Sequence, residues 1–82
     1  MSYYVYMLKL ISKKSITYVG YTKDIKKRIS LHNSGKGAKF TRGRKWKLIY
    51  IEKFASKNKA ISRECYIKKN RILRNKIKSK FI

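Results

Sequence analysis

Three stretches of the chain carry the residue pattern of β-strands. The first, residues 3–11, is rich in aromatic and β-branched side chains, and the polar segment 12–15 separates it from a second such stretch, residues 16–21. Two strands joined by so short a polar segment form a hairpin. Apolar and polar side chains alternate again over residues 47–54, which predicts a third strand.

A stretch between the second and third strands has the signals of an α-helix. Thr22 is the expected N-cap, Asp24 lies in the first turn, where it suits the helix dipole, and the helix extends to Asn33. Gly35 follows closely and is expected to end the helix. The stretch therefore predicts one short helix before the third strand.

A second helical stretch begins after the third strand. Ser56 can cap it, and the following side chains recur at helical spacing: Ala60, Ile61, Glu64, Ile67 and Lys68. The pattern allows either one helix that runs to Ser79 or a kink near Asn70. In either case we expect burial of the apolar side chains that follow Asn70: Ile72, Leu73, Ile77 and Phe81. Residues 1–82 are thus predicted to form one small α+β domain with helices packed on a sheet.

The charge balance is extreme for so small a domain. The 82 residues include 24 Lys and Arg but only three acidic side chains, a formal net charge of +21, and 43% of them are hydrophobic, enough for a core. An AT-rich genome raises the Lys and Ile content of any protein, so the scarcity of acids is the more informative feature. A soluble protein normally mixes its charges, and we therefore predict nucleic acid as the partner.

Several other classes of protein do not fit the sequence. The apolar run at residues 3–8 ends at Lys9 and is too short to span a membrane, and no signal peptide is expected. The single Cys65 excludes an internal disulfide, and one Cys with one His cannot complete a four-ligand zinc site. Three acids make a carboxylate-rich two-metal site unexpected. We expect a cytoplasmic protein, with association with the nucleoid as an option.

The predicted hairpin gathers tyrosines on one face of the sheet. A turn centred in the polar segment places Tyr18 opposite Leu8 and Gly20 opposite Tyr6. Because side chains alternate between faces, Tyr6 and Tyr18 then share a face with Gly20. A glycine at this position leaves space for a ligand between two phenols. The competing interpretation is a tyrosine-rich face that packs against a helix.

The first predicted helix carries two polar side chains on its apolar side. Arg28 and His32 share one helical stripe with Ile25 and Ile29, which points all four toward the sheet. A guanidinium on a buried stripe needs an anionic partner, and because carboxylates are so few, a substrate phosphate is a candidate. Alternatively, Arg28 and His32 reach solvent at the edge of the helix.

Each of the three acids can be given a role. Glu64 lies on the apolar side of the second helix, where it either pairs with Lys68, four residues on, or holds a hard divalent cation. We interpret Glu52 as structural and Asp24 as a helix cap.

A basic, glycine-punctuated segment, residues 35–46, links the first helix to the third strand. We expect a set of cations in and beyond it to bind the nucleic-acid backbone without reading sequence: Lys36, Lys39, Arg42, Arg44, Lys45 and Lys68. The interleaved Phe40 and Trp46 can stack on an unpaired base, although Trp46 fits the core equally well.

In this order, these residues resemble the GIY-YIG nuclease superfamily. The resemblance rests on two short motifs, three single residues and two longer stretches: Tyr4-Val5-Tyr6, Tyr18-Val19-Gly20, Arg28, His32, Glu64, HNSGKGAKFTRGRKWKLIYIEKF and AISRE. It covers about residues 3–70. The chain is similar to the small stand-alone single-domain proteins of the superfamily and to the nuclease domain of structure-specific endonuclease subunits that cut branched DNA.

The resemblance implies a three-stranded antiparallel β-sheet flanked by α-helices, and hydrolysis of phosphodiester bonds that depends on Mg²⁺ or Mn²⁺. Carried over by position, it assigns two motif tyrosines, a catalytic arginine, a histidine one turn later and a metal-binding glutamate: Tyr6, Tyr18, Arg28, His32 and Glu64. The chain departs from the family pattern at Tyr4, which replaces a glycine, and a downstream asparagine is either Asn70 or Asn75.

The expected reaction is cleavage of DNA, selective for branched or flapped structure rather than for sequence, with any partner subunit unknown. Glu64 would anchor the metal ion, Arg28 would stabilise charge on the phosphoryl group, and Tyr6 is the favoured base. We expect the surrounding cations to lower the pKa of that phenol, and His32 is the rival base. Two alternatives stay open: a nucleic-acid-binding protein of this fold without turnover, and a ribosome-associated protein.

Overall fold

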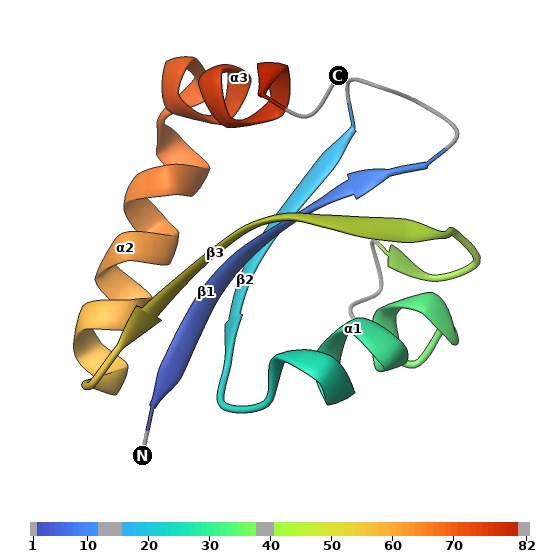
Figure 1. Ribbon diagram of the computed structural model, residues 1–82, viewed down its shortest axis with the longest axis horizontal. Coiled ribbons are helices and arrows are strands. Elements are labelled where there is room, and N and C mark those ends of the chain that lie inside the picture. The colour runs from blue at the N-terminus through green and yellow to red at the C-terminus, as the bar shows by residue number, and fades with distance from the viewer. Residues whose placement is uncertain (1, 12–15, 38–40, 81–82) are drawn as a thin grey trace.

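The computed structural model describes residues 2–11, 16–37 and 41–80, and these residues form a β-sheet with helices on both faces (Figure 1). The sheet is antiparallel, with strand order β2-β1-β3, and it is built from β1 (Tyr3–Leu10), β2 (Thr17–Thr22) and β3 (Trp46–Phe54). The helices are α1 (Ile25–Asn33), α2 (Lys57–Lys69) and α3 (Arg71–Ser79). The predicted α+β class, a three-stranded antiparallel sheet flanked by helices, is therefore confirmed. None of the helices in the described ranges is long and apolar enough to cross a membrane.

The hairpin of β1 and β2 has the predicted register. Tyr6 lies opposite Gly20 and Leu8 lies opposite Tyr18, so both tyrosine side chains point to the same face. The turn expected at residues 12–15 lies outside the described residues. Because β1 is paired on both sides, Tyr6 is held at the centre of the sheet, whereas Tyr18 stands on the edge strand.

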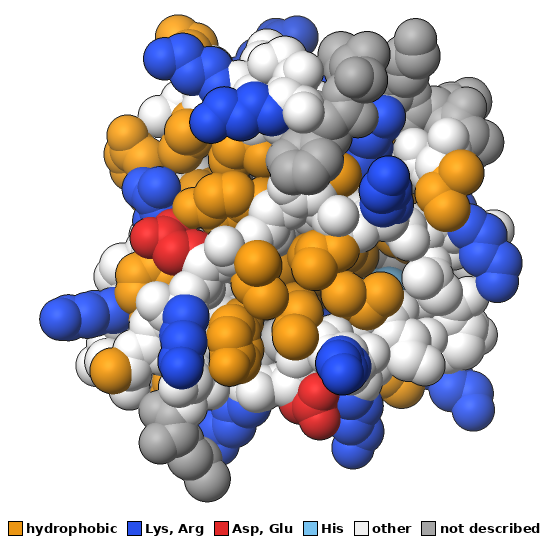
Figure 2. All heavy atoms as spheres, viewed as in Figure 1, with side chains coloured by type: hydrophobic (Ala, Val, Ile, Leu, Met, Phe, Trp, Pro, Cys, Tyr) orange, Lys and Arg blue, Asp and Glu red, His pale blue; other side chains and the backbone are white. Residues whose placement is uncertain are grey.

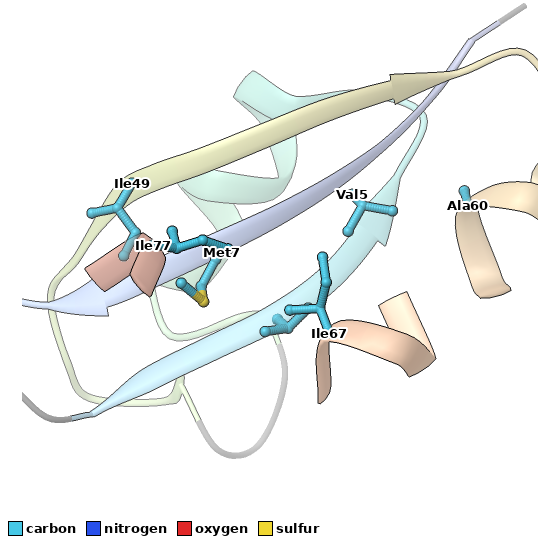
Figure 3. Close-up of a cluster of buried hydrophobic side chains, with 7 residues drawn as sticks. Val5, Met7, Ile49, Ala60, Ile67 and Ile77 are labelled. Atoms are coloured by element: carbon cyan, nitrogen blue, oxygen red, sulfur yellow. The ribbon is translucent and has the colours of Figure 1, made fainter. Parts of the chain in front are cut away.

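The two faces of the sheet bury two separate clusters. On one face, α2 and α3 contribute apolar side chains that meet those of all three strands (Figure 3): Val5, Met7, Val19, Ile49, Ala60, Ile67 and Ile77. On the other face, Ile25 and Ile29 of α1 pack with a second set: Tyr6, Leu8, Leu10 and Trp46. Neighbouring residues of a strand point to opposite faces, which is why β1 contributes to both clusters.

Trp46 belongs to the core rather than to a stacking surface. It is 2% exposed, and its indole N–H donates to the carbonyl of Thr41 at 3.2 Å. Its backbone N–H donates to Oδ1 of Asn33 at 2.7 Å, so the end of α1 fixes the start of β3. The stacking role considered for Trp46 is therefore wrong, and Phe40 lies outside the described residues.

The N-cap of α1 is Asp24 rather than Thr22. The Oδ1 atom of Asp24 accepts a hydrogen bond from the backbone N–H of Lys27 at 3.1 Å. Thr22 still belongs to β2, where it pairs with Tyr4, and its hydroxyl accepts from the N–H of Asp24 at 3.2 Å. The prediction of Thr22 as N-cap is wrong for this reason, and the capping role expected of Asp24 is confirmed.

The long helical stretch breaks at Asn70. The backbone there is extended, with φ −108° and ψ 90°, and Oδ1 of Asn70 accepts from the N–H of Leu73 at 3.0 Å, which caps α3. Leu73 and Ile77 pack on the sheet, but Ile72 is 72% exposed. The expected burial of Ile72 is wrong, because residues five apart on a helix point about 140° away from each other. Phe81 lies outside the described residues.

Glu52 has the structural role expected of it. Its Oε1 atom accepts hydrogen bonds from the hydroxyl of Tyr50 at 2.5 Å and from Nε of Arg63 at 3.0 Å. Arg63 lies on α2 and Tyr50 on β3, so this carboxylate ties the helix to the edge of the sheet.

Candidate active site

Tyr6 and Tyr18 stand side by side on the sheet face that α1 covers, with their ring centroids 6.4 Å apart. A Cβ atom on Gly20 would lie 2.6 Å from the hydroxyl oxygen of Tyr6 and 3.2 Å from Cε2 of Tyr18. Any residue larger than glycine would therefore displace the phenol of Tyr6. The prediction that Gly20 leaves room for a ligand is wrong, because Tyr6 itself fills that space.

The helix α1 brings two polar side chains onto the hydroxyl of Tyr6. The Nε2 atom of His32 lies 2.8 Å from this hydroxyl, and Nε of Arg28 donates to it at 3.4 Å. Both reach it because residues four apart lie on the same side of a helix. The predicted stripe is confirmed, and since His32 is fully buried, the alternative that it reaches solvent is wrong. Arg28 is partly exposed while it contacts the phenol.

Thr41 extends these contacts into a chain of hydrogen bonds, with its Oγ1 2.7 Å from Nδ1 of His32. An arginine only donates, and Tyr6 is fully buried, so the hydroxyl of Tyr6 accepts from Arg28 and donates to His32. A neutral His32 that accepts on Nε2 carries its proton on Nδ1 and donates to Thr41. The chain therefore runs in one direction, from Arg28 to Thr41.

Burial keeps Tyr6 and His32 uncharged at neutral pH. Desolvation raises the pKa of Tyr6 to about 12, and the hydrogen bond from Arg28 offsets only part of this effect. Desolvation also lowers the pKa of His32 below its ordinary value of 6.5, and the charge of Arg28 lowers it further. The expectation that nearby cations lower the pKa of the Tyr6 phenol is therefore wrong, because the loss of water outweighs one guanidinium.

Glu64 comes from α2, the helix on the opposite face of the sheet. Its side chain is 17% exposed and lies 3.6 Å from Nζ of Lys68, which confirms the ion pair considered for these residues. Burial is the main cause of the raised pKa of Tyr6, but the charge of Glu64 adds to it, so the carboxylate lies within electrostatic range of the phenol.

A single carboxylate limits which metal ion this site fits. No group of three or more His, Cys, Asp or Glu side chains occurs together in residues 2–11, 16–37 and 41–80. Magnesium keeps several of its waters and uses one or two protein carboxylates together with substrate phosphates. Glu64 therefore fits Mg²⁺, or the similar Mn²⁺, better than metals that need a full set of protein ligands.

The cations expected to bind the nucleic-acid backbone lie outside this buried chain. Four of them are exposed between α1 and β3: Lys36, Arg42, Arg44 and Lys45. Lys39 lies outside the described residues, and the side chain of Lys68, on α2, is 51% exposed. On the face drawn in Figure 2, basic side chains are spread around the periphery and acidic ones are few.

Two residues of the site were not found by sequence reasoning. Thr41 orders the ring of His32, and Gly37 packs so closely that a Cβ there would lie 2.5 Å from Nδ1 of His32. Both belong to the segment between α1 and β3, where no periodicity marks a side chain as buried. The one signal in the sequence that could have pointed to these two residues is the stretch that begins at His32, which contains both of them and carries part of the family resemblance.

Comparison with known proteins defines the class to which this fold and site belong. The GIY-YIG catalytic domain matches residues 2–78, and the chain therefore belongs to the GIY-YIG family, a family of nuclease domains. The resemblance found in the sequence is confirmed.

Within this family the chain is similar to UPF0213 proteins. The UPF0213 protein of Streptococcus pneumoniae serotype 4 (strain ATCC BAA-334 / TIGR4) is 46% identical over 72 residues, which are 87% of this chain and 73% of the relative. That of Clostridium perfringens (strain 13 / Type A) is 54% identical over 67 residues, 80% of this chain and 70% of the relative. The solution NMR structure of the UPF0213 protein BH0048 from Bacillus halodurans is 39% identical, with a TM-score of 0.55 over 93% of this chain and 80% of that chain. These names state no activity.

Proposed function

We propose that this protein is a metal-dependent DNA endonuclease. The observation that carries the proposal is the convergence of Arg28 and His32, one turn apart on α1, on the phenol of Tyr6 beside Tyr18. Burying polar and ionisable groups costs free energy, and such groups with shifted pKa values concentrate at functional sites. A nuclease-family domain over residues 2–78 supports the same function.

Glu64 is the residue that would hold Mg²⁺ or Mn²⁺. Of the other acids, Glu52 is bonded to Tyr50 and Arg63, and Asp24 caps α1, which leaves Glu64 for this role. A bound Mg²⁺ ion supplies Lewis-acid stabilisation of the charge that develops on a phosphate during hydrolysis.

Exposure divides the remaining site residues into two pairs. Tyr18 and Arg28 are partly exposed and can touch a phosphate and the attacking water, whereas Tyr6 and His32 are fully buried. Arg28 would stabilise negative charge on the phosphoryl group. Exposure supports Tyr18 as the residue whose phenol oxygen takes the proton of the water after passing its own hydroxyl proton to solvent, with Tyr6 and His32 orienting Arg28. Tyr6 as the base, the prediction from the sequence, is the alternative.

The proposed substrate is DNA that carries a branch or a flap. The exposed cations between α1 and β3 would contact phosphates, and such contacts position DNA without reading its sequence. Contacts of this kind favour selectivity for structure over sequence.

Cleavage assays with linear, flapped and branched DNA, in Mg²⁺ or in EDTA, test the proposal. We expect nicking of flapped or branched DNA in Mg²⁺ alone, and a loss of about 100-fold or more in Glu64→Gln, in line with removal of a charge-stabilising group. Glu52→Gln is the matched control and should keep its activity.

Cleavage that survives Glu64→Gln would overturn the metal assignment. Tight, salt-sensitive binding without cleavage of any substrate would favour a binding protein without turnover, and co-sedimentation with ribosomes would favour the ribosome-associated alternative.

The identity of the base is tested by comparing Tyr6→Phe with Tyr18→Phe. If Tyr18 accepts the proton, Tyr18→Phe should lower kcat by about 100-fold or more, the usual contribution of a general base. Tyr6→Phe should then lower kcat less, through looser placement of Arg28. A Tyr18→Phe enzyme with full activity, together with an inactive Tyr6→Phe enzyme, would return the role of base to Tyr6.

A further inference from the structure

A basic groove lies on the side of the sheet away from β3. It has a volume of about 530 Å³ and runs between residues 16–19, at the start of β2, and the region where α2 passes into α3. Five polar side chains form its helical wall: Lys68, Arg71, Arg74, Asn75 and Lys78. Among the described residues that line it none is acidic, and three of its cations, all on α3, belong to none of the sites described above.

The cations of α3 form a line rather than a cluster. Arg71, Arg74 and Lys78 are three and four residues apart, so they share one side of the helix. Seven residues of α-helix span about 10 Å, and one strand of B-DNA carries a phosphate about every 3.4 Å along its axis. The line is therefore long enough to meet about three successive phosphates of one strand.

One of these cations is fixed by the fold. The guanidinium of Arg74 donates through Nη1 to the carbonyls of Ile67, at 2.9 Å, and of Lys68, at the end of α2. These bonds satisfy helix-terminal carbonyls and hold the guanidinium at the break between α2 and α3. Its remaining N–H donors are preorganised in a fork that suits phosphate oxygens.

The strand side of the groove adds backbone donors. β2 is an edge strand, and the N–H of Leu10 donates to the carbonyl of Ile16, so the even-numbered residues of β2 face β1. Hydrogen-bonding direction alternates along an antiparallel strand, and the backbone groups of Thr17 and Val19 therefore point away from β1. Backbone N–H groups are common ligands of DNA phosphates.

Two residues link the groove to the candidate active site. Tyr18 lines the groove, and its ring centroid lies 5.0 Å from that of His32. Lys68 also lines the groove and pairs with Glu64. A strand that lies along the groove thus passes Tyr18 on β2 and Lys68, the partner of Glu64, on α2.

We infer that this groove binds the sugar–phosphate backbone of one DNA strand next to the scissile phosphate, with Arg71, Arg74 and Lys78 as its phosphate ligands. The inference rests on the proposed nuclease function, because that function places a scissile phosphate at Tyr18 and Glu64. It makes α3 a substrate-binding element rather than only a cover for the sheet.

Binding of a fluorescent flap DNA in EDTA, measured over a range of salt concentrations, tests the groove without any need for cleavage. The variant Arg71→Gln/Lys78→Gln keeps Arg74 and its structural bonds. Losing two phosphate contacts should reduce the slope of log K against log salt by about 1.4 to 1.8 and weaken binding about tenfold at moderate salt. The matched control is Lys57→Gln/Lys59→Gln, an equal charge loss on exposed residues about 13 to 17 Å from Lys68 along α2, and it should change the slope much less.

A second measurement locates the contact on the DNA. Neutral methylphosphonate linkages, moved one step at a time along one strand, should weaken binding to the wild type over a window of about three linkages. That window should shrink in Arg71→Gln/Lys78→Gln toward the single linkage that Arg74 still contacts, and it should persist at full width in Lys57→Gln/Lys59→Gln. An unchanged window in the groove variant, or equal slopes in the two variants, would overturn the inference. A wild type that shows the window but cleaves no DNA would leave the groove standing and refute the proposed nuclease function.

Discussion

At the scale of single residues, the site depends on Tyr6, whose hydroxyl is bonded to both Arg28 and His32. Burial raises the pKa of Tyr6 to about 12, from 10.0 in water. A raised pKa means that the neutral phenol stabilises the fold fully below about pH 10, and that this stability is lost as the pH rises toward 12, by about 1.4 kcal/mol per pH unit. We therefore expect wild type to lose more stability between about pH 10 and pH 11 than Tyr6→Phe, which has no proton to lose.

Urea unfolding of the two proteins at a series of alkaline pH values checks this expectation. Lysines also titrate in this range, but they do so in both proteins, so the difference between the two curves isolates Tyr6. Tyr66→Phe is the matched control, because Tyr66 is 53% exposed, and it should follow wild type. Parallel alkaline curves for wild type and Tyr6→Phe would contradict a buried, neutral phenol.

Thr41 leads to a second prediction at this scale. Thr41→Val removes the acceptor of the His32 Nδ1–H and leaves a buried donor unpaired, which should cost about 1–3 kcal/mol of stability. The same change should lower the cleavage rate, since His32 then loses the group that orients its ring. Thr41→Ser keeps the hydroxyl and should restore most of both properties. Urea unfolding at pH 7 and single-turnover cleavage measure the two effects, and a Thr41→Val protein as stable as Thr41→Ser would refute the hydrogen bond.

The same residues show how far sequence reasoning reaches. Strand and helix periodicity predicted Tyr6 with Tyr18 on one face of the sheet and Arg28 with His32 on one stripe of the helix. The resemblance to the GIY-YIG superfamily joined the two pairs into one site, and the structure brings them together. The link to Thr41 was not predictable in this way, because it depends on where a loop passes. The direction of the pKa shift of Tyr6 was also beyond reach, since it is decided by desolvation, which a sequence does not display.

At the scale of elements, the break between α2 and α3 determines which side chains line the basic groove. Asn70 ends α2 and caps α3, with its Oδ1 3.0 Å from the N–H of Leu73. Asn70→Ala should destabilise the protein by about 1 kcal/mol, the usual cost of losing an N-cap, and Asn70→Asp should retain the cap. Urea unfolding measures both variants.

Asn58 provides the control for this cap. It is exposed within α2, where replacement by Ala removes no cap, so Asn58→Ala should stay within about 0.5 kcal/mol of wild type. If Asn70→Ala were equally neutral, α3 would be held by its packing on the sheet alone. The sequence left this break undecided because the helical spacing of apolar residues continues across Asn70, and only the tertiary packing of Leu73 and Ile77 requires the restart.

At the scale of the whole molecule, the scarcity of acids shapes both the site and its stability. Asp24 caps α1 and Glu52 ties β3 to α2, which leaves Glu64 as the one acid for the proposed metal ion, so the proposed chemistry has to use a single carboxylate. The net charge itself does not locate the active site. It predicted a nucleic-acid partner, whereas the groove beside Tyr18 depends on the tertiary arrangement of β2, α2 and α3, which a sequence pattern does not display.

The net charge of +21 should also make the stability depend on salt. The molecule measures 33 × 29 × 19 Å, and at about 0.01 M salt the Debye length is about 30 Å, so cations repel one another across its full width. At about 0.15 M the Debye length falls to about 8 Å, and only close neighbours still interact. We therefore expect Tm to rise with sodium chloride over this range, by about 4–8 °C for each kcal/mol of repulsion removed.

Removing positive charge should raise Tm as adding salt does, and the two increases in Tm should not be additive. Lys57→Gln/Lys59→Gln carries two fewer positive charges at exposed positions, so its Tm should exceed that of wild type at about 0.01 M salt. At about 1 M salt, where the Debye length is about 3 Å, the difference should vanish because the repulsion is already screened. Calorimetric scans of both proteins at the two salt concentrations measure this convergence. A Tm advantage that persists undiminished at high salt would mean that the substitutions act through helix propensity and not through the field of the whole molecule.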